Sequence, residues 1–267
     1  MKKRIYFQIV ALLCATKVLA NETTSVQTLD NSNFSLSAGV NYNSNFYKPS
    51  SPEHFSTLEP RLIPSYKISE NLSLSTIFWG EKELNDKREF NLYDSYVSFQ
   101  HRFYKNEFFS LTQELRGYIP LSEDSLKNRH LQTSAYYALS LDTSWKSLKI
   151  GYKPSLKRNF HQFQTTMTGS SNTQWTLSHN FVARYALTEK LSLSSINYYI
   201  QHRTYVGNTK DFFWFIAESD YQVNEKLNLS IGYSNYDSPL NADGRSNVVR
   251  LINQQNATFY TGATYRF

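Results

Sequence analysis

The sequence has a single cysteine, Cys14, and only nine glycines and seven prolines among its 267 residues. Because Cys14 lies in the first twenty residues, the rest of the chain can form neither a disulfide framework nor a cysteine-ligated metal site. Long apolar runs are also missing. Beyond residue 20 the longest spans 212–217, far below the roughly 18 residues that a membrane helix needs. These absences exclude a disulfide-stapled scaffold and a helical membrane protein.

Aromatic residues are abundant, with 20 Tyr, 18 Phe and 4 Trp, and 40% of the chain is hydrophobic. Leu, Ile, Val and Phe are spread along the whole length, which a disordered chain would not show. A chain of 267 residues suits one large domain or two small ones. Many of the remaining residues are Ser and Asn, so the composition indicates a folded, polar β protein.

The amino terminus has the pattern of a secretory signal peptide. A basic stretch at 2–4 precedes an apolar stretch at 5–15, and Val18 and Ala20 occupy the positions that a signal peptidase reads. We predict cleavage after Ala20, so that 1–20 is the signal peptide and 21–32 is a short periplasmic segment. Lipidation at Cys14 is the alternative, but Leu13 stands where that signal needs a small residue.

The signal segment also carries much of the positive charge. The whole chain has a formal net charge of +6, and residues 1–20 hold four Lys or Arg and no Asp or Glu. The remainder therefore has a net charge of +2. This removes most of the support for nucleic-acid binding, and we expect no nucleic-acid partner.

From Phe34 onward, apolar residues recur at every second position, which is the period of a β-strand. The clearest segments are 34–42, 131–141 and 227–233, where apolar residues alternate with small or polar ones. We predict twelve strands, at about 33–47, 54–68, 72–81, 89–103, 107–119, 129–142, 147–158, 173–186, 191–205, 210–223, 227–237 and 253–267.

The connectors between these segments alternate between short and long. Short connectors within 68–74, 187–193 and 223–229 place Asn, Glu, Lys or Thr between apolar residues, which is typical of tight hairpin turns. Longer, irregular connectors lie at about 48–53, 81–88, 120–128, 159–172, 206–209 and 238–252. A soluble sandwich is the alternative, but sandwiches mix hairpins with crossovers, so the alternation favours an up-and-down barrel.

The segment from Ala257 to Phe267 alternates and ends on an aromatic residue. Together with the signal peptide and the twelve segments, it resembles bacterial outer-membrane β-barrel proteins of the small, porin-like kind. The resemblance implies an all-β fold over 33–267: a closed antiparallel transmembrane up-and-down barrel with short periplasmic turns and longer extracellular loops. Twelve strands are expected, with ten or fourteen as alternatives. It also implies that Tyr265 and Phe267 form a signal read by the barrel-assembly machinery.

Three prolines depart from this pattern, because Pro60, Pro64 and Pro154 lie inside expected strands. Each proline removes one backbone donor from a sheet ladder. Segments 54–68 and 147–158 are therefore the weakest of the twelve predictions.

If the apolar parity faces lipid, the opposite parity lines the lumen and carries charges that a packed core would not tolerate unpaired. A ladder of cations on one strand face would bias a pore toward anions. Pairing of the charges inside a plugged barrel is the alternative, although twelve strands enclose more room than the eight that side chains just fill. The predicted pore-lining bases are Lys149, Lys153, Lys157, Arg184, Arg203 and Arg116, and the predicted acids are Glu114, Glu218 and Asp220.

Aromatic residues near the strand ends are expected to form girdles at the two membrane interfaces. The candidates are Tyr93, Phe103, Phe109, Trp175, Phe213, Tyr221 and Tyr265.

Three functions fit these features. The first is passive diffusion of small polar solutes with a modest anion preference. The second is a non-conducting barrel for adhesion or envelope structure, in which the loops would bind partners. The third is a phospholipase-like enzyme: His54 and Ser56 have the spacing that such barrels use, with an Asn to orient the His. We expect no Asn at their height and assign no catalytic residue.

The other histidines show no ligand spacing, so we expect no metal site, and no cofactor follows from the sequence. The expected partners are outer-membrane lipid and lipopolysaccharide, the barrel-assembly machinery, and small polar or anionic solutes. The expected location is the outer membrane of a Gram-negative bacterium. The sequence fixes neither the solute nor the oligomeric state.

Overall fold

A computed structural model describes residues 33–85, 89–238, 251 and 257–267. The predicted signal peptide (1–20) and N-terminal segment (21–32) lie outside the described residues. The described residues form one short helix, η2 (Asp124–Asn128), and thirteen strands: β1 (Phe34–Asn45), β2 (Ser56–Ser69), β3 (Leu72–Glu83), β4 (Phe90–Leu92), β5 (Ser95–Lys105), β6 (Phe109–Ile119), β7 (Leu131–Trp145), β8 (Leu148–His161), β9 (Thr173–Ala186), β10 (Leu191–Thr204), β11 (Thr209–Gln222), β12 (Leu227–Asp237) and β13 (Ala257–Arg266).

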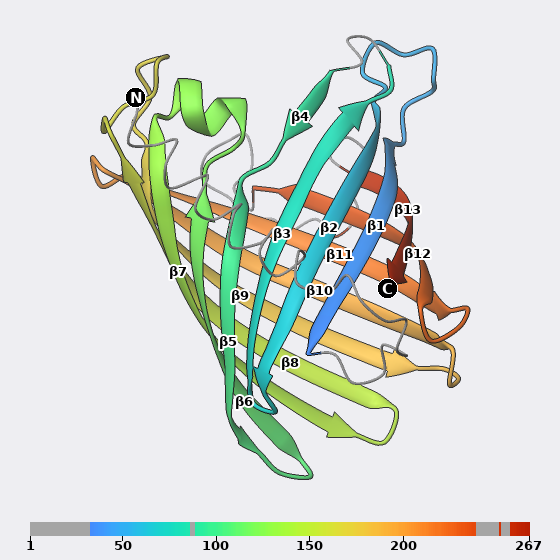
Figure 1. Cartoon of the computed structure of the whole chain (residues 1–267). Coiled ribbons are helices and arrows are strands. Elements are labelled where there is room, and N and C mark those ends of the chain that lie inside the picture. Colours follow the sequence, from blue (N-terminus) through green and yellow to red (C-terminus); the bar gives the residue numbers. More distant parts are fainter. Residues whose placement is uncertain (1–32, 86–88, 239–250, 252–256) are drawn as a thin grey trace, which may run out of the picture. The chain divides into compact units, whose positions relative to one another are not determined.

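The strands form one antiparallel sheet that closes on itself (Figure 1). From β5 to β13 each strand pairs with the next along the chain, and β13 pairs with β1. The ring is completed because β2 pairs with both β1 and β3, and β3 pairs with β5. The three-residue β4 pairs with β3 beside the end of β5. The fold is therefore a closed up-and-down barrel of twelve strands with one extra short strand.

All twelve predicted segments are confirmed as strands. Segments 173–186 and 227–237 match β9 and β12 residue for residue, the other described ends differ by at most three residues, and 253–256 of the last segment lie outside the described residues. Segment 89–103 is divided into β4 and β5. The pairing with β3 shifts register between these two strands, which inserts one extra residue opposite β3.

The predicted alternation of connector lengths is confirmed except at 205–208, which has four residues, as many as the turn-end connectors 187–190 and 223–226. The short connectors 70–71, 106–108, 146–147, 187–190 and 223–226 lie at one end of the barrel, here called the turn end. The connectors 46–55, 120–130, 162–172 and 205–208 lie at the other end, the loop end, whereas most of the predicted connector at 238–252 lies outside the described residues. Both sets follow from a topology in which every strand pairs with its sequence neighbour. In the described part of the chain no helix is long and apolar enough to cross a membrane.

The prolines interrupt hydrogen bonding on one side of a strand only. β2 pairs with β1 without a break from Ser56 to Tyr66, whereas its pairing with β3 skips Pro60 and Pro64. Alternate residues of a strand bond to the same neighbour, so both prolines weaken the same ladder. Pro154 acts in the same way, because β8 loses pairs with β7 there and keeps its pairs with β9. The two weakest predictions are therefore strands with one incomplete ladder each.

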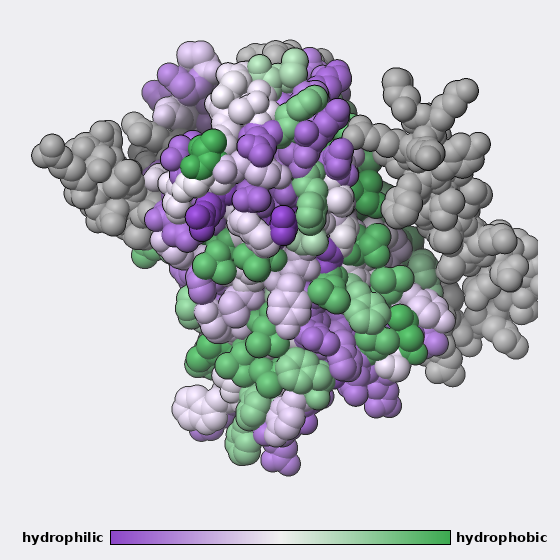
Figure 2. All heavy atoms as spheres, turned by 90° about the vertical axis from the view of Figure 1, so that its left-hand side faces the viewer, coloured by the Kyte–Doolittle hydropathy of each residue, from purple (hydrophilic) through white to green (hydrophobic). Residues whose placement is uncertain are grey.

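The barrel is apolar outside and polar inside, the reverse of a soluble domain. Only three hydrophobic residues are buried among the described ones, against fourteen polar or charged residues. Large apolar side chains such as Leu115, Phe181 and Ile231 are more than half exposed. Figure 2 shows one face, on which hydrophobic residues gather across the middle and lower part, below a hydrophilic top. An apolar surrounding would match this outer surface.

Candidate functional site

The inner wall of the barrel carries eight of the nine predicted pore-lining residues. Directly paired residues share a face of the sheet, and every second residue of a strand returns to that face. Side-chain contacts such as that between Lys153 and Glu114 then show which alternate residues of each strand face the inside of the barrel. The residues that face inside are Glu114 and Arg116 on β6, Lys149, Lys153 and Lys157 on β8, Arg184 on β9, and Glu218 and Asp220 on β11.

Arg203 lies on the outer face, so its prediction as a pore-lining residue is wrong. It pairs with Trp175 on β9 and with Thr209 on β11, whereas the inward residues of β10 have even numbers. The sequence misleads here because β10 carries apolar side chains on both faces. Ile196, Tyr198 and Ile200 point inward, and the apolar parity therefore does not identify the outer face.

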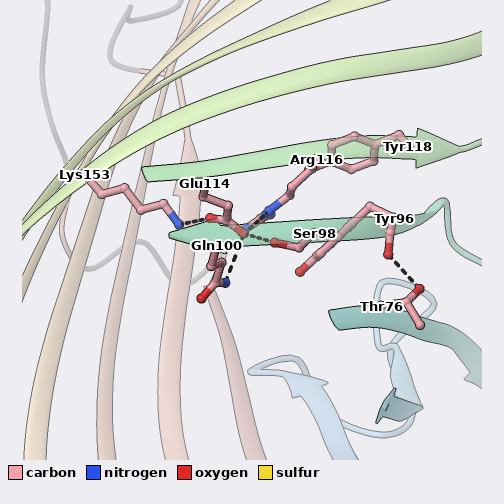
Figure 3. A network of polar contacts seen from close by, with 8 residues as sticks. All are labelled: Thr76, Tyr96, Ser98, Gln100, Glu114, Arg116, Tyr118 and Lys153. Carbon is pink, nitrogen blue, oxygen red and sulfur yellow. Dashed lines mark hydrogen bonds and ion pairs between the residues drawn. The ribbon is translucent and has the colours of Figure 1, made fainter. Parts of the chain in front are cut away.

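Glu114 is the centre of a charged network on the inner wall (Figure 3). Arg116 reaches it with Nε at 2.6 Å and Nη2 at 3.0 Å, and Lys153 Nζ lies 2.5 Å from Oε2. Ser98 donates to Oε1 at 2.6 Å and Gln100 at 3.3 Å. The carboxylate is 2% exposed. One buried carboxylate thus holds two cations from two different strands.

A small residue on β7 allows this network to form. Glu114 pairs directly with Ala138, which lies between β6 and β8 and is fully buried. The side chain of Lys153 passes over this position to reach Glu114. A larger residue at 138 would stand in that path. β6 and β8 are therefore joined across β7 by side-chain charges, in addition to the ladders that each forms with β7.

Aromatic rings complete the surroundings of the basic residues. The guanidinium of Arg116 lies 4.3 Å from the ring centre of Tyr96 and 4.6 Å from that of Tyr136. Nζ of Lys157 lies 4.0 Å above the ring of Tyr118. The faces of aromatic rings attract such cations electrostatically. Glu114 and the tyrosines thus hold Arg116, Lys153 and Lys157 against the inner wall.

A second polar cluster lies on β11 and its neighbours. Tyr260 donates to Glu218 at 2.7 Å, and its ring lies over Gly232, where any larger residue would overlap it. Asp220 accepts from Asn228 at 3.1 Å and lies 3.4 Å from Arg184. Glu218 and Asp220 thus both face the lumen from β11, whereas Lys149, Lys153 and Lys157 lie on β8.

A cavity of about 530 Å³ opens at the turn end. Five cations and three carboxylates are among its lining residues. They are Lys149, Arg184, Lys190, Lys226 and Arg266, with Glu189, Asp220 and Glu225. A second hollow of about 360 Å³ lies on the β1–β6 side of the same end and includes Lys67, Glu70 and Arg102. The turn-end mouth thus carries an excess of positive charge.

Aromatic residues line part of the inner wall, which the sequence did not indicate. Tyr198, Trp214 and Tyr236 are paired in one row across β10, β11 and β12. The rings of Tyr198 and Trp214 stack with centres 5.1 Å apart, and Trp214 meets Tyr236 edge-on at 6.3 Å. Trp214 lies in the run 212–217, where both faces of the strand are apolar, so alternation gives no signal there.

The bulge between β4 and β5 turns two residues inward. Tyr93 donates to Glu81 at 2.8 Å and packs on Trp79 with ring centres 4.5 Å apart. Its prediction as an interfacial girdle residue is therefore wrong, because the extra residue of the bulge changes the parity. The next residue, Asp94, accepts backbone N–H groups of Leu121 and Ser122 at 3.0 Å each. It thereby ties the β6–β7 loop to the barrel.

The exposed middle of that loop carries an ion pair of its own. Lys127 donates to Glu123 at 2.5 Å one helical turn away. This contact holds the pKa of the Glu123 carboxyl below its ordinary value. Both side chains are mostly exposed, so the pair lies in high dielectric and contributes little to stability.

The pair His54 and Ser56 lies at the loop end, and the expectation that no Asn approaches it is wrong. His54 Nδ1 lies 3.2 Å from Asn45 Oδ1. Ser56 Oγ, however, donates to Asn85 Oδ1 at 2.5 Å, and Asn85 Nδ2 donates to the backbone oxygen of His54. Among the described contacts no hydrogen bond joins His54 to Ser56. These contacts close the β1–β2 loop onto the β3 end.

No protein-family model matches the sequence, and no curated protein matches it. The fold does match solved structures. The KdgM porin superposes with a TM-score of 0.54 at 8% identity, over 86% of this chain and 99% of that one. An outer-membrane channel from Pseudomonas putida F1 gives 0.58 at 11%, over 91% and 100%. The NanC porin gives 0.57 at 12%, over 86% and 98%. The chain therefore has the fold of porin-like, twelve-stranded outer-membrane barrels.

Proposed function

We propose that this chain is an outer-membrane channel through which small polar solutes diffuse passively, with a modest preference for anions. The observation that carries the proposal is the combination of an apolar outer surface and a charged inner wall in one closed barrel. Closure satisfies the backbone hydrogen bonds within the sheet, as a bilayer core requires. The outer face would contact lipid, and the inner face would line water.

A barrel of twelve strands would leave room for a path through its interior. Eight strands enclose a space that side chains just fill, and twelve enclose more. The network around Glu114 runs along β5 to β8, so its members share one part of the wall. Short turns face the periplasm in barrels of this kind. The turn-end cavity would then be the periplasmic mouth of the channel.

The anion preference would arise chiefly at this mouth. Within the described residues neither Lys149 nor Arg266 forms an ion pair, and both line the cavity. Arg116 and Lys153 instead share the carboxylate of Glu114, which offsets part of their charge. Unpaired cations in a pore mouth raise the local concentration of anions.

Replacing Lys149 and Arg266 together by Glu is expected to reverse the ion preference. The charges that line the mouth would change from five cations and three carboxylates to the opposite ratio. The measurement is the conductance and reversal potential, in a planar bilayer under a KCl gradient, of protein purified from outer membranes. Wild type should give stable steps with an anion-directed potential, and the double variant a cation-directed one.

Lys146→Glu is the matched control for this experiment. Lys146 lies in the neighbouring β7–β8 turn, with Nζ 5.3 Å from the Trp145 ring centre, and it does not line the cavity. Its charge reversal should leave the selectivity near the wild-type value. An unchanged selectivity in the Lys149→Glu, Arg266→Glu variant would contradict the assignment of the mouth. A folded but silent barrel would contradict the channel and favour a role in adhesion or envelope structure.

A further inference from the structure

Two arginines flank a tryptophan on the outer face of the barrel, near the loop end. Arg158 on β8 pairs directly with Trp175 on β9, and Trp175 pairs directly with Arg203 on β10. The three side chains therefore form one row across three strands, here called the Arg158–Trp175–Arg203 row. Neighbouring strands lie about 4.8 Å apart, which places the two arginine backbones roughly 10 Å from each other. Both arginines are exposed.

The positive charge of this row is not neutralised by an ion pair within the described residues. The Arg158 guanidinium lies 4.8 Å from the ring centre of Trp175 and 5.2 Å from that of Phe160, which positions the side chain and leaves its charge in place. The outer-face carboxylate of Asp211 lies two residues beyond the partner of Arg203 and accepts from Gln201 at 3.1 Å. One carboxylate near two guanidiniums leaves a positive excess.

The row stands at the edge of the apolar surface. The outward residues of β8 from Leu148 to Leu156 are Leu, Ile, Tyr, Pro and Leu. Eight residue steps extend roughly 26 Å along a strand, and at a tilt of about 40° they cover roughly 20 Å of height, close to the apolar band of outer-membrane barrels. Arg158 is the next outward residue toward the loop end. The row therefore lies where hydrocarbon would give way to head groups.

We propose that the Arg158–Trp175–Arg203 row binds the phosphate of a lipid head group in the outer leaflet. This inference goes beyond transport, but it rests on the placement of the barrel in an outer membrane proposed above. A phosphate offers several acceptor oxygens, and guanidiniums bind such groups through paired N–H donors. Trp175 between them would pack at the interface against the apolar part of the same lipid.

The test is lipid binding by full-length protein purified from outer membranes, measured by native mass spectrometry during titration with bisphosphorylated lipid A. Arg158→Gln combined with Arg203→Gln removes both charges and keeps side-chain amides in place. Binding is expected to weaken about thirtyfold, since each interfacial cation contributes roughly a fivefold factor. Dephosphorylated lipid A should bind wild type and variant equally weakly.

Lys105→Gln combined with Lys146→Gln is the matched control, because it removes two exposed cations at the turn end, one of them also beside a tryptophan. This control should bind lipid A like wild type. Equal binding by the arginine variant and wild type would overturn the proposal. Displacement of lipid A by millimolar inorganic phosphate would overturn it as well, since the site would then recognise a free anion.

The arginine variant should conduct like wild type, because neither residue faces the lumen. If the barrel does not conduct, but the arginine variant still binds lipid A more weakly than wild type does, only the proposed channel function is contradicted.

Discussion

Replacing Glu114 by Gln is expected to lower the free energy of unfolding of the barrel by about 3 kcal/mol, because breaking a buried charge network leaves its cations without a counter-charge. Arg116 and Lys153 would lose the one carboxylate that both contact, and their side chains are only 19% and 26% exposed. Ser98 now donates to a carboxylate oxygen of Glu114, and in the variant it would face an amide group there instead. Urea unfolding in lipid vesicles, followed by tryptophan fluorescence, measures the change.

The same variant should also conduct with a stronger anion preference. Removal of one negative charge beside Arg116 and Lys153 makes the middle of the inner wall more positive. The reversal potential under a KCl gradient reports this shift independently of stability. A stability loss without any shift in selectivity would mean that the network lies away from the ion path.

Two further variants show whether burial causes the stability effect. Glu123→Gln removes an exposed carboxylate from its ion pair with Lys127, and such pairs are worth at most about 1 kcal/mol. Adding Lys153→Gln to Glu114→Gln should restore part of the lost stability. In the single variant Lys153 has lost its carboxylate partner, and the second substitution removes this unpaired cation. If Glu114→Gln costs no more than Glu123→Gln, water in the lumen solvates the cations and the network is not a structural element.

The fold could be predicted from the sequence because, in a barrel with an apolar outer face and a polar inner face, apolar and polar residues alternate along each strand. In β9 and β12 one face is mostly apolar and the other mostly small or polar, and the predicted bounds of both elements match the structure to the residue. Prolines do not prevent the prediction of β2 and β8. Each strand forms two ladders, one with each neighbouring strand, and a missing backbone donor affects only one of them. The split of segment 89–103 could not be predicted, because a bulge depends on cross-strand register rather than on local sequence.

The inner wall was only partly predictable, for a related reason. Charged residues on β6 and β8 alternate with clear apolar partners, so Glu114 and Lys153 were placed correctly on a common face. Arg203 and Trp214 lie on strands whose two faces are both apolar in part, and parity there is set by pairing with neighbours. Alternation therefore identifies a lumen only where the lumen is polar. The aromatic row and the outer arginines required the three-dimensional register.

If Phe267 belongs to a signal that the barrel-assembly machinery reads, replacing it by Ala is expected to reduce strongly the amount of folded barrel in the outer membrane. An aromatic anchor in a recognised segment contributes about 2 kcal/mol, which corresponds to about thirtyfold weaker binding to the assembly machinery. In the barrel the Phe267 ring packs edge-on against Tyr265 with centres 4.9 Å apart, and its N–H donates to the Leu36 oxygen at 2.9 Å. The backbone contact is retained in the variant, and Phe267 is already 60% exposed in the folded barrel. Heat-modifiable mobility on gels of outer-membrane fractions measures the folded amount.

Phe259→Ala separates recognition from closure of the barrel. Phe259 lies on β13 with the same parity and pairs with Ser44 and Tyr233, so its loss removes an outer-face ring from the same seam without changing the terminal residues. If Phe267 acts as an assembly signal, Phe267→Ala should fold as well as wild type into detergent or lipid vesicles and fail only in cells. Phe259→Ala should assemble in cells to nearly the wild-type amount. Equal failure of Phe267→Ala in vesicles and in cells would instead mean that the residue stabilises the β1–β13 seam, since refolding without the machinery depends on the barrel's own contacts alone.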